Sequence, residues 1–200
     1  MLFNLLEVGA VLCALAYMIL VAREHIACWA FAFVSTALFT IVFFEAALSF
    51  SMLLNLYYMV MAGYGYWQWR QPTDKVVNPS TSIHTRHPTF HLTLISVGLL
   101  ISAVLIAGTL DMVNTVGDTF NQAMLIGILD IVVSVFSVMA TVMVAHKVYE
   151  NWFYWMAINA SAVVLYSLSE LYMSAGLFVI YFVFSLYGWR EWRGLIAQRT

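Results

Sequence analysis

Two short stretches, YGYWQWR at residues 64–70 and YGWREWR at residues 187–193, decide how the chain is organised. They lie 123 positions apart, and each combines aromatic side chains with a glycine and a closing arginine. The same register matches further residues of unlike chemistry: Trp29 with Trp152, Ser51 with Ser174, Tyr58 with Tyr181, and Glu7 with Asp130. Tryptophan, glycine, arginine and a carboxylate rarely fall in one register by accident. We therefore interpret the chain as two homologous halves.

Composition places both halves in lipid. Of 200 residues, 64% are hydrophobic and 9% are charged, whereas a soluble domain carries about 25% charged residues because its surface faces water. Apolar runs of about 20 residues are long enough, as helices, to cross a hydrocarbon core about 30 Å thick. Seven such runs are present: 3–22, 28–48, 50–68, 92–110, 124–145, 152–168 and 171–189. We expect an all-α membrane protein with seven transmembrane helices.

The basic residues predict how these helices are oriented. Cytoplasmic flanks of membrane helices keep Lys and Arg during insertion. If seven helices alternate in direction, all eight basic residues fall on one side, whereas the other side carries Glu45, Asp111, Asp118 and Glu170. We therefore expect the N-terminus outside the cell and the C-terminus in the cytoplasm.

All three prolines lie in the polar stretch 70–91, which is typical of a long loop. Three helices reverse the chain direction, so the fourth apolar run restores it and predicts two parallel three-helix bundles. We expect the first bundle at residues 1–70, the linker loop with the fourth transmembrane helix at 71–120, and the second bundle at 121–200. In such folds the solute site lies between the bundles near the midplane, and rocking of one bundle exposes it alternately.

Several classes of function are excluded by the residue content. Cys13 and Cys28 have neither paired spacing nor histidine partners, which argues against a disulfide framework and a zinc site. A net charge of −2 leaves no basic surface for nucleic acid. His84, His87 and His91 fall in the proline-containing loop without cysteines or carboxylates at fixed spacing, which favours a solvated loop over a metal site. Catalytic and nucleotide-binding motifs are missing, so we expect no enzyme activity, metal or cofactor.

The segment KVYENWFYW at residues 147–155 and the aromatic ending of each half carry a family resemblance. Together with Tyr166, Tyr172 and Tyr181, they resemble the nicotinamide riboside transporter family of the PnuC type over residues 8–193. The resemblance implies a three-plus-one-plus-three fold similar to the SWEET sugar transporters, and a homotrimer in the bacterial inner membrane. It also implies facilitated diffusion of nicotinamide riboside, a vitamin B3 precursor, which a cytoplasmic kinase traps by phosphorylation. Asn151, inside this segment, is implied as a solute-binding residue.

Two positions depart from the family pattern. Members that carry nicotinamide riboside often have an acidic residue where Asn159 stands and a glutamine where Thr141 stands. Members of this family also carry thiamine, riboflavin or deoxynucleosides, so the resemblance indicates a small aromatic vitamin-type solute more firmly than one compound. Thiamine, which is also a flat cation, is the first alternative.

Polar residues inside the apolar runs are candidates for the solute site because lipid penalises them unless they face a cavity or a partner. The carboxylate of Asp130 suits a cationic ring, whereas Glu7 has an equally good structural role at an outer helix end. Asn55 and Asn159 suit ribose hydroxyls or a carboxamide, with helix-to-helix hydrogen bonding as the alternative. Thr141 lies near one stripe with Asp130, and its alternative role is packing.

Aromatic residues provide a second set of candidates. Trp155 lies four residues before Asn159, on the same helical face, and is the candidate for stacking on a flat cation. Tyr58 and Tyr181, which the repeat matches, either face each other across the central axis or pack within their bundles. Four tryptophans beside arginines are expected in an interfacial belt instead: Trp67, Trp69, Trp189 and Trp192. A membrane scaffold or a non-transporting sensor remains the alternative class of function.

Overall fold

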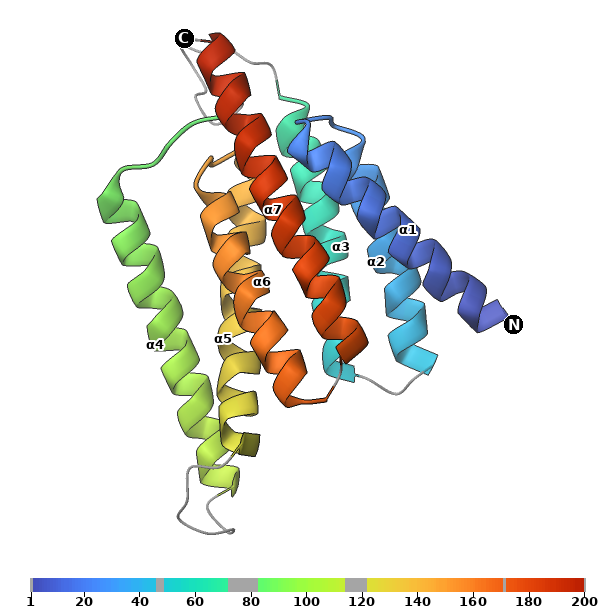
Figure 1. The fold of residues 1–200 in the computed structure, drawn as a ribbon, viewed down its shortest axis with the longest axis vertical. Coiled ribbons are helices and arrows are strands. Elements are labelled where there is room, and N and C mark those ends of the chain that lie inside the picture. Colours follow the sequence, from blue (N-terminus) through green and yellow to red (C-terminus); the bar gives the residue numbers. More distant parts are fainter. Residues whose placement is uncertain (1, 46–48, 72–82, 114–121, 171, 200) are drawn as a thin grey trace. The chain divides into compact units, whose positions relative to one another are not determined.

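The apolar runs of the sequence form α-helices in a computed structural model of the chain (Figure 1). The structure describes residues 2–45, 49–71, 83–113, 122–170 and 172–199. Within these residues there are seven helices: α1 (Leu2–Ala22), α2 (Cys28–Glu45), α3 (Ser49–Trp69), α4 (Pro88–Val113), α5 (Gln122–Ala145), α6 (Asn151–Leu168) and α7 (Tyr172–Arg199). The described part of the chain contains no β-strand beyond one isolated bridge between His84 and Val148. The prediction of an all-α protein with seven helices is therefore confirmed.

Two helix boundaries differ from the prediction for identifiable reasons. Helix α4 begins at Pro88, so Pro88 and His91 are helical and their assignment to the loop was wrong. Proline is well suited to the first helical position because its fixed φ is already helical and its missing N–H has no helical partner there. Helix α7 continues past Trp189 to Arg199, because arginine and glutamine are good helix formers that hydropathy does not register. Pro72, Pro79 and Asp118 lie outside the described residues.

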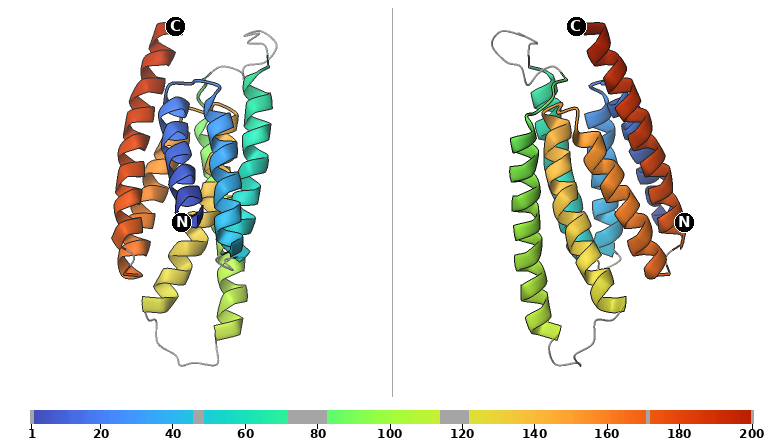
Figure 2. Two further views of the ribbon diagram at one scale, coloured as in Figure 1. Left: turned by 90° about the vertical axis from the view of Figure 1, so that its right-hand side faces the viewer. Right: turned by 60° about the vertical axis from the view of Figure 1, so that its left-hand side comes forward.

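The chain forms two compact units that each draw on distant parts of the sequence. The first unit comprises Met1–His84, Thr141–Tyr149 and Tyr187–Thr200, and the second comprises Thr85–Ala140 and Glu150–Leu186. Helices α5 and α7 are therefore each divided between the two units. In the first unit, α2 packs against both α1 and α3, as Figures 1 and 2 show from three sides.

Close contacts fix the packing of α1, α2 and α3. The Ser35 hydroxyl of α2 donates a hydrogen bond to the Ala10 carbonyl of α1 at 2.8 Å. Gly65 lets α3 approach α2, because a Cβ built on this glycine would lie 2.4 Å from the ring of Trp29. A buried hydroxyl bonded to a backbone carbonyl satisfies its polarity without water. These contacts hold Trp29 in a buried position between the two helices.

In the second unit, hydrogen bonds and one close approach join α4, α5 and α6. Gly98 of α4 faces the Phe136 ring of α5, which a Cβ would meet at 2.8 Å. His91 Nδ1 and the Tyr154 hydroxyl lie 3.1 Å apart and link α4 to α6. The Gln122 side chain donates to the Leu168 carbonyl at 2.6 Å and links α5 to α6. The unit is therefore held by polar contacts near both ends of its helices.

Large apolar side chains are exposed along the helices. On α4, Leu92, Leu100 and Val104 are 68%, 65% and 63% exposed. Water disfavours a surface of this kind, whereas lipid tails accommodate it. Among the described residues, two helical stretches are both long and apolar enough to cross a bilayer, Pro88–Gly108 and Met124–Ala145. Val8–Ala22 and Cys28–Ile41 are shorter apolar helices.

Candidate functional site

A buried amide–hydroxyl pair joins α6 to α7 in the second unit. Asn159 and Ser185 are both buried, and the Asn159 Nδ2 donates to the Ser185 Oγ at 3.0 Å. Ser185 in turn donates to the carbonyl of Tyr181, one helical turn earlier, at 2.9 Å. A primary amide offers two donor hydrogens and one acceptor oxygen. This bond to Ser185 uses one of the two donors, so a helix-to-helix role and a ligand-binding role are compatible at Asn159.

An aromatic row lies on the same two helices. The rings of Tyr166 and Phe178 stack, with centroids 5.0 Å apart and an interplanar angle of 15°. Phe178 then meets Tyr181 edge to face, with centroids 5.6 Å apart. Aromatic faces carry negative potential and attract flat cations. Tyr181 therefore belongs to both groups: its ring is part of the aromatic row, and its backbone carbonyl accepts the hydrogen bond of Ser185.

Three other predicted residues belong to the second unit. Trp155 is half-buried on α6, one turn before Asn159, and Asn151 is fully buried as the first residue of α6. Asp130 is exposed on α5. The side chain of Glu7, its match in the first half, lies outside what the structure describes. Asp130, Trp155 and Asn159 therefore remain predicted solute-binding residues.

The remaining predicted residues belong to the first unit. Asn55 and Tyr58 are half-buried on α3, and Thr141 is buried near the end of α5. The ring of Tyr58 lies 5.5 Å from that of Tyr57, centroid to centroid. Of the predicted residues, the structure brings Asn159 and Tyr181 together, because both are hydrogen-bonded to Ser185. Asn55, Tyr58 and Thr141 belong to the other unit.

Sequence reasoning missed Ser185, Phe178 and an ion pair in the first unit. Lys147 Nζ lies 2.9 Å from Glu24 Oε1, and both side chains are nearly buried. Glu24, in the turn between α1 and α2, and Lys147, in the turn between α5 and α6, each have a φ of 54°. A non-glycine residue in this left-handed region is strained by about 1–3 kcal/mol and persists only where its surroundings impose it. The two positions are 123 residues apart, so the repeat register would have paired them.

A buried tryptophan, Trp69, contacts this ion pair, and a second, Trp192, lies beside the first. The indole N–H of Trp69 donates to the Ala145 carbonyl at 3.1 Å, and that of Trp192 donates to the Val21 carbonyl at 3.1 Å. Their rings lie 6.4 Å apart, and the Lys147 ammonium lies 4.7 Å from the Trp69 ring centre. The prediction of an interfacial belt was therefore wrong for Trp69 and Trp192. Carbonyls at a helix end lack intrahelical donors. The Ala145 carbonyl accepts from the Trp69 indole, and the Val21 carbonyl accepts from both the Trp192 indole and the Glu24 backbone N–H.

Two further contacts follow the same register. The Tyr64 hydroxyl and His146 Nε2 lie 3.0 Å apart. At the matching positions, Arg23 Nε donates to the Tyr187 hydroxyl at 3.4 Å. This hydrogen bond raises the pKa of the Arg23 guanidinium above its ordinary value, so the side chain remains a cation. Backbone hydrogen bonds between His84 and the 147–149 segment also hold the Lys147 turn, at 3.2 and 2.8 Å.

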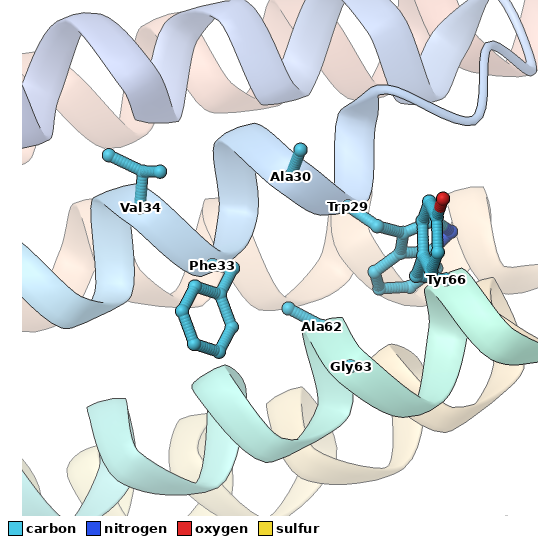
Figure 3. A pocket seen from close by; sticks show the side chains of 7 residues that line it. All are labelled: Trp29, Ala30, Phe33, Val34, Ala62, Gly63 and Tyr66. Atoms are coloured by element: carbon cyan, nitrogen blue, oxygen red, sulfur yellow. The ribbon is translucent and has the colours of Figure 1, made fainter.

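An apolar groove of about 330 Å³ lies between α2 and α3. Its lining residues are Trp29, Ala30, Phe33, Val34, Ala62, Gly63 and Tyr66. Figure 3 shows the side chains of Phe33 and Ala62 in the space between the two helices, with Tyr66 beside Trp29. A polar solute needs several hydrogen-bonding partners, and this lining offers little beyond the Tyr66 hydroxyl. The predicted polar residues lie elsewhere.

Comparisons by sequence and by structure find the same group of relatives. A family model described as "Nicotinamide mononucleotide transporter" matches residues 4–194. The chain is 24% identical over 196 residues to the nicotinamide riboside transporter PnuC of Escherichia coli (strain K12) and to that of Shigella flexneri, covering 90% of this chain and 81% of each relative. A crystal structure of the vitamin B3 transporter PnuC is similar with a TM-score of 0.70 at 20% identity, covering 98% of this chain and 84% of that one. The two chains share their fold.

Proposed function

Because the chain belongs to the nicotinamide mononucleotide transporter family, we propose that it is a membrane carrier for the uptake of nicotinamide riboside. The proposal is carried by the buried Asn159–Ser185 pair beside the aromatic row of α6 and α7. Nicotinamide riboside combines a flat pyridinium cation with a carboxamide and ribose hydroxyls. Such a solute needs both an aromatic surface and amide or hydroxyl groups held in place.

Charge favours a riboside over the corresponding mononucleotide. A phosphate group is bound in proteins by arginine, lysine or helix N-termini. None of the eight Lys and Arg residues falls within the apolar runs from which the sequence predicts membrane spans. Lys147, which is nearly buried, is already paired with Glu24. The observation supports a solute that carries a positive ring and no phosphate.

The proposed roles of the site residues follow from their chemistry. Trp155 offers an indole face to the pyridinium, and the carboxylate of Asp130 offsets its positive charge. Asn159, fixed by Ser185, hydrogen-bonds the carboxamide or the ribose, and buried bonds of this kind are specific because an analogue lacking the partner leaves them unsatisfied. Five residues are proposed to complete the set: Asn55, Tyr58, Thr141, Asn151 and Tyr181.

The membrane arrangement is also part of the proposal. All seven helices cross the bacterial inner membrane, with the N-terminus outside and the C-terminus in the cytoplasm, and the halves form two parallel three-helix bundles joined by α4. Residues 1–70 and 121–200 supply the bundles, and 71–120 supply the linker. The solute crosses by facilitated diffusion, a cytoplasmic kinase traps it by phosphorylation, and the carrier works as a homotrimer. The positive-inside distribution of Lys and Arg and the 123-residue repeat support this arrangement.

A binding panel tests the choice of solute. Purified protein is titrated with nicotinamide riboside, nicotinamide mononucleotide, thiamine, riboflavin and a deoxynucleoside, and tryptophan fluorescence and melting temperature are recorded. Nicotinamide riboside is expected to bind most tightly, and the mononucleotide more weakly because its phosphate finds no cation. Tighter binding of thiamine would reassign the solute within the family, whereas no response to any compound would favour a scaffold or a sensor.

A further inference from the structure

The side-chain contacts around Glu24 and Lys147 join the first half of the sequence to the second. We call these residues the turn cluster: Arg23, Glu24, Tyr64, Trp69, His146, Lys147, Tyr187 and Trp192. All of them belong to the first unit, so their positions relative to one another are defined. Within the cluster, α3 contacts the end of α5, and α7 contacts the end of α1. The two contacts are reciprocal: the third helix of each half bonds the end of the first helix of the other half.

Reciprocity makes the turn cluster a single cooperative element. Every one of these hydrogen bonds, together with the ion pair, crosses from one half to the other, so movement of the halves apart at this end breaks them together. Packed interfaces with two discrete arrangements switch between states instead of deforming continuously. If the halves part at this end, all of these contacts are therefore expected to be lost in one step.

The chemistry of the turn cluster suits opening better than permanent fastening. A nearly buried ion pair adds little stability compared with apolar side chains of the same size, so a permanent junction is better served by hydrophobic packing. When such a pair separates into water, however, both charges are solvated again. The strained φ of 54° at both Glu24 and Lys147 also marks these turns as positions that the surrounding contacts hold in place.

We propose that the turn cluster is the inner gate of the carrier, with the Glu24–Lys147 pair as its latch. The inference rests on the proposed transport function and on the positive-inside orientation, which puts both turns on the cytoplasmic side. The latch closes the pathway while the solute is bound from outside. It separates when the two halves part at this end, and the solute then leaves to the cytoplasm.

Cys28 provides a built-in reporter of opening. It is 0% exposed, begins α2, and precedes Trp29, whose ring packs edge-on against Trp69 with centroids 5.5 Å apart. In a Cys13→Ser background, a small membrane-impermeant thiol reagent is applied to sealed vesicles from either face, without solute. Glu24→Gln and Lys147→Gln are each expected to raise the labelling rate of Cys28 about tenfold, from the cytoplasmic face only. A tenfold change is the size expected when a two-state equilibrium loses a coupling free energy of typical magnitude.

Two controls separate the gate from general loosening. Arg190→Gln removes a charge from an exposed position of α7 and is expected to leave labelling unchanged. The double exchange Glu24→Lys with Lys147→Glu restores the pair at positions that share the same φ, and it is expected to return labelling close to the rate of the Cys13→Ser parent.

Three results would overturn the gate. They are unchanged labelling in both single variants, equal acceleration from both faces, and a double exchange that labels as fast as the single variants while melting at the parent temperature. The labelling experiment contains no solute, so its result does not depend on uptake. A negative uptake assay would therefore count against the transport function and leave the labelling result standing.

Discussion

At the scale of single residues, Gly65 illustrates how closely the helices approach. A Cβ at this position would lie 2.4 Å from the Trp29 ring, whereas a Cβ at Gly63, half a turn away on α3, meets nothing within 4 Å. We expect Gly65→Ala to destabilise the protein by about 1–3 kcal/mol through overpacking. Gly63→Ala should instead stabilise α3 by about 0.5–1 kcal/mol, since glycine is a poor helix former. Melting temperatures of both variants in detergent test this, and equal shifts would contradict the packing at Gly65.

The Asn159–Ser185 pair carries the second prediction at this scale. Ser185→Ala leaves a buried amide N–H of Asn159 without its acceptor and frees the amide to rotate, which typically costs about 1–3 kcal/mol. We expect nicotinamide riboside to bind about tenfold or more weakly to both Asn159→Ala and Ser185→Ala. Ser167→Ala, at an exposed position on α6, is the matched control and should bind normally. Normal binding by the Asn159→Ala variant would remove this residue from the site.

Residue chemistry predicted some of these positions and not others. Asn159 was identifiable because a buried amide in an apolar helix is costly and needs a reason. Ser185 was not, because a serine in a helix satisfies its own hydroxyl by bonding a carbonyl one turn back, as it does with Tyr181. Its additional bond to Asn159 depends on the packing of α6 against α7.

At the scale of elements, two indoles cap helix ends across the halves. Trp69 and Trp192 donate to carbonyls at the ends of α5 and α1. Replacement of either by phenylalanine removes one buried hydrogen bond, and we expect a loss of about 1 kcal/mol or more for each. Trp67→Phe, at a side chain that is 58% exposed, should change little. Unfolding in detergent measures all three variants, and a Trp67 effect as large as the other two would contradict the capping role.

Hydropathy located the helices because each apolar run is long and bounded by polar residues. It misplaced the start of α4 and the end of α7, where a proline begins the helix and charged residues extend it. Hydropathy measures contact with lipid, whereas helix length also depends on capping and on propensity in water. Trp69 was assigned to the interfacial belt because it stands beside Arg70, and that neighbour does not reveal that the indole is buried against the end of α5.

At the scale of the whole molecule, the repeat register is the most informative feature of the sequence. It matched Tyr64 with Tyr187 before any geometry was considered, and it also relates Glu24 to Lys147, a pair that only the structure revealed. The register alone states which positions correspond; it does not state that the third helix of one half reaches the first helix of the other. That reciprocal contact, seen in the hydrogen bonds of Trp69 and Trp192, depends on tertiary packing.

The absence of an ion relay leads to the prediction about coupling. Three carboxylates lie within the predicted spans, Glu7, Asp130 and Glu45, and all fall toward the outer ends of their spans. Proton- or sodium-driven carriers generally use buried titratable groups whose occupancy changes between states. We therefore expect Asp130→Asn to weaken binding of the cationic solute while uptake stays insensitive to a proton gradient. A variant that binds normally but loses the ability to concentrate solute would identify Asp130 as a proton site.

Uptake of labelled nicotinamide riboside into proteoliposomes, with and without an imposed pH difference, tests the central claim most directly. The account predicts protein-dependent entry that stops when the internal and external concentrations are equal, at the same rate with or without the proton gradient. Unlabelled nicotinamide riboside inside the vesicles should accelerate exchange of the label. No entry above that of protein-free vesicles would contradict transport, and accumulation above the external concentration when protons flow inward would contradict facilitated diffusion.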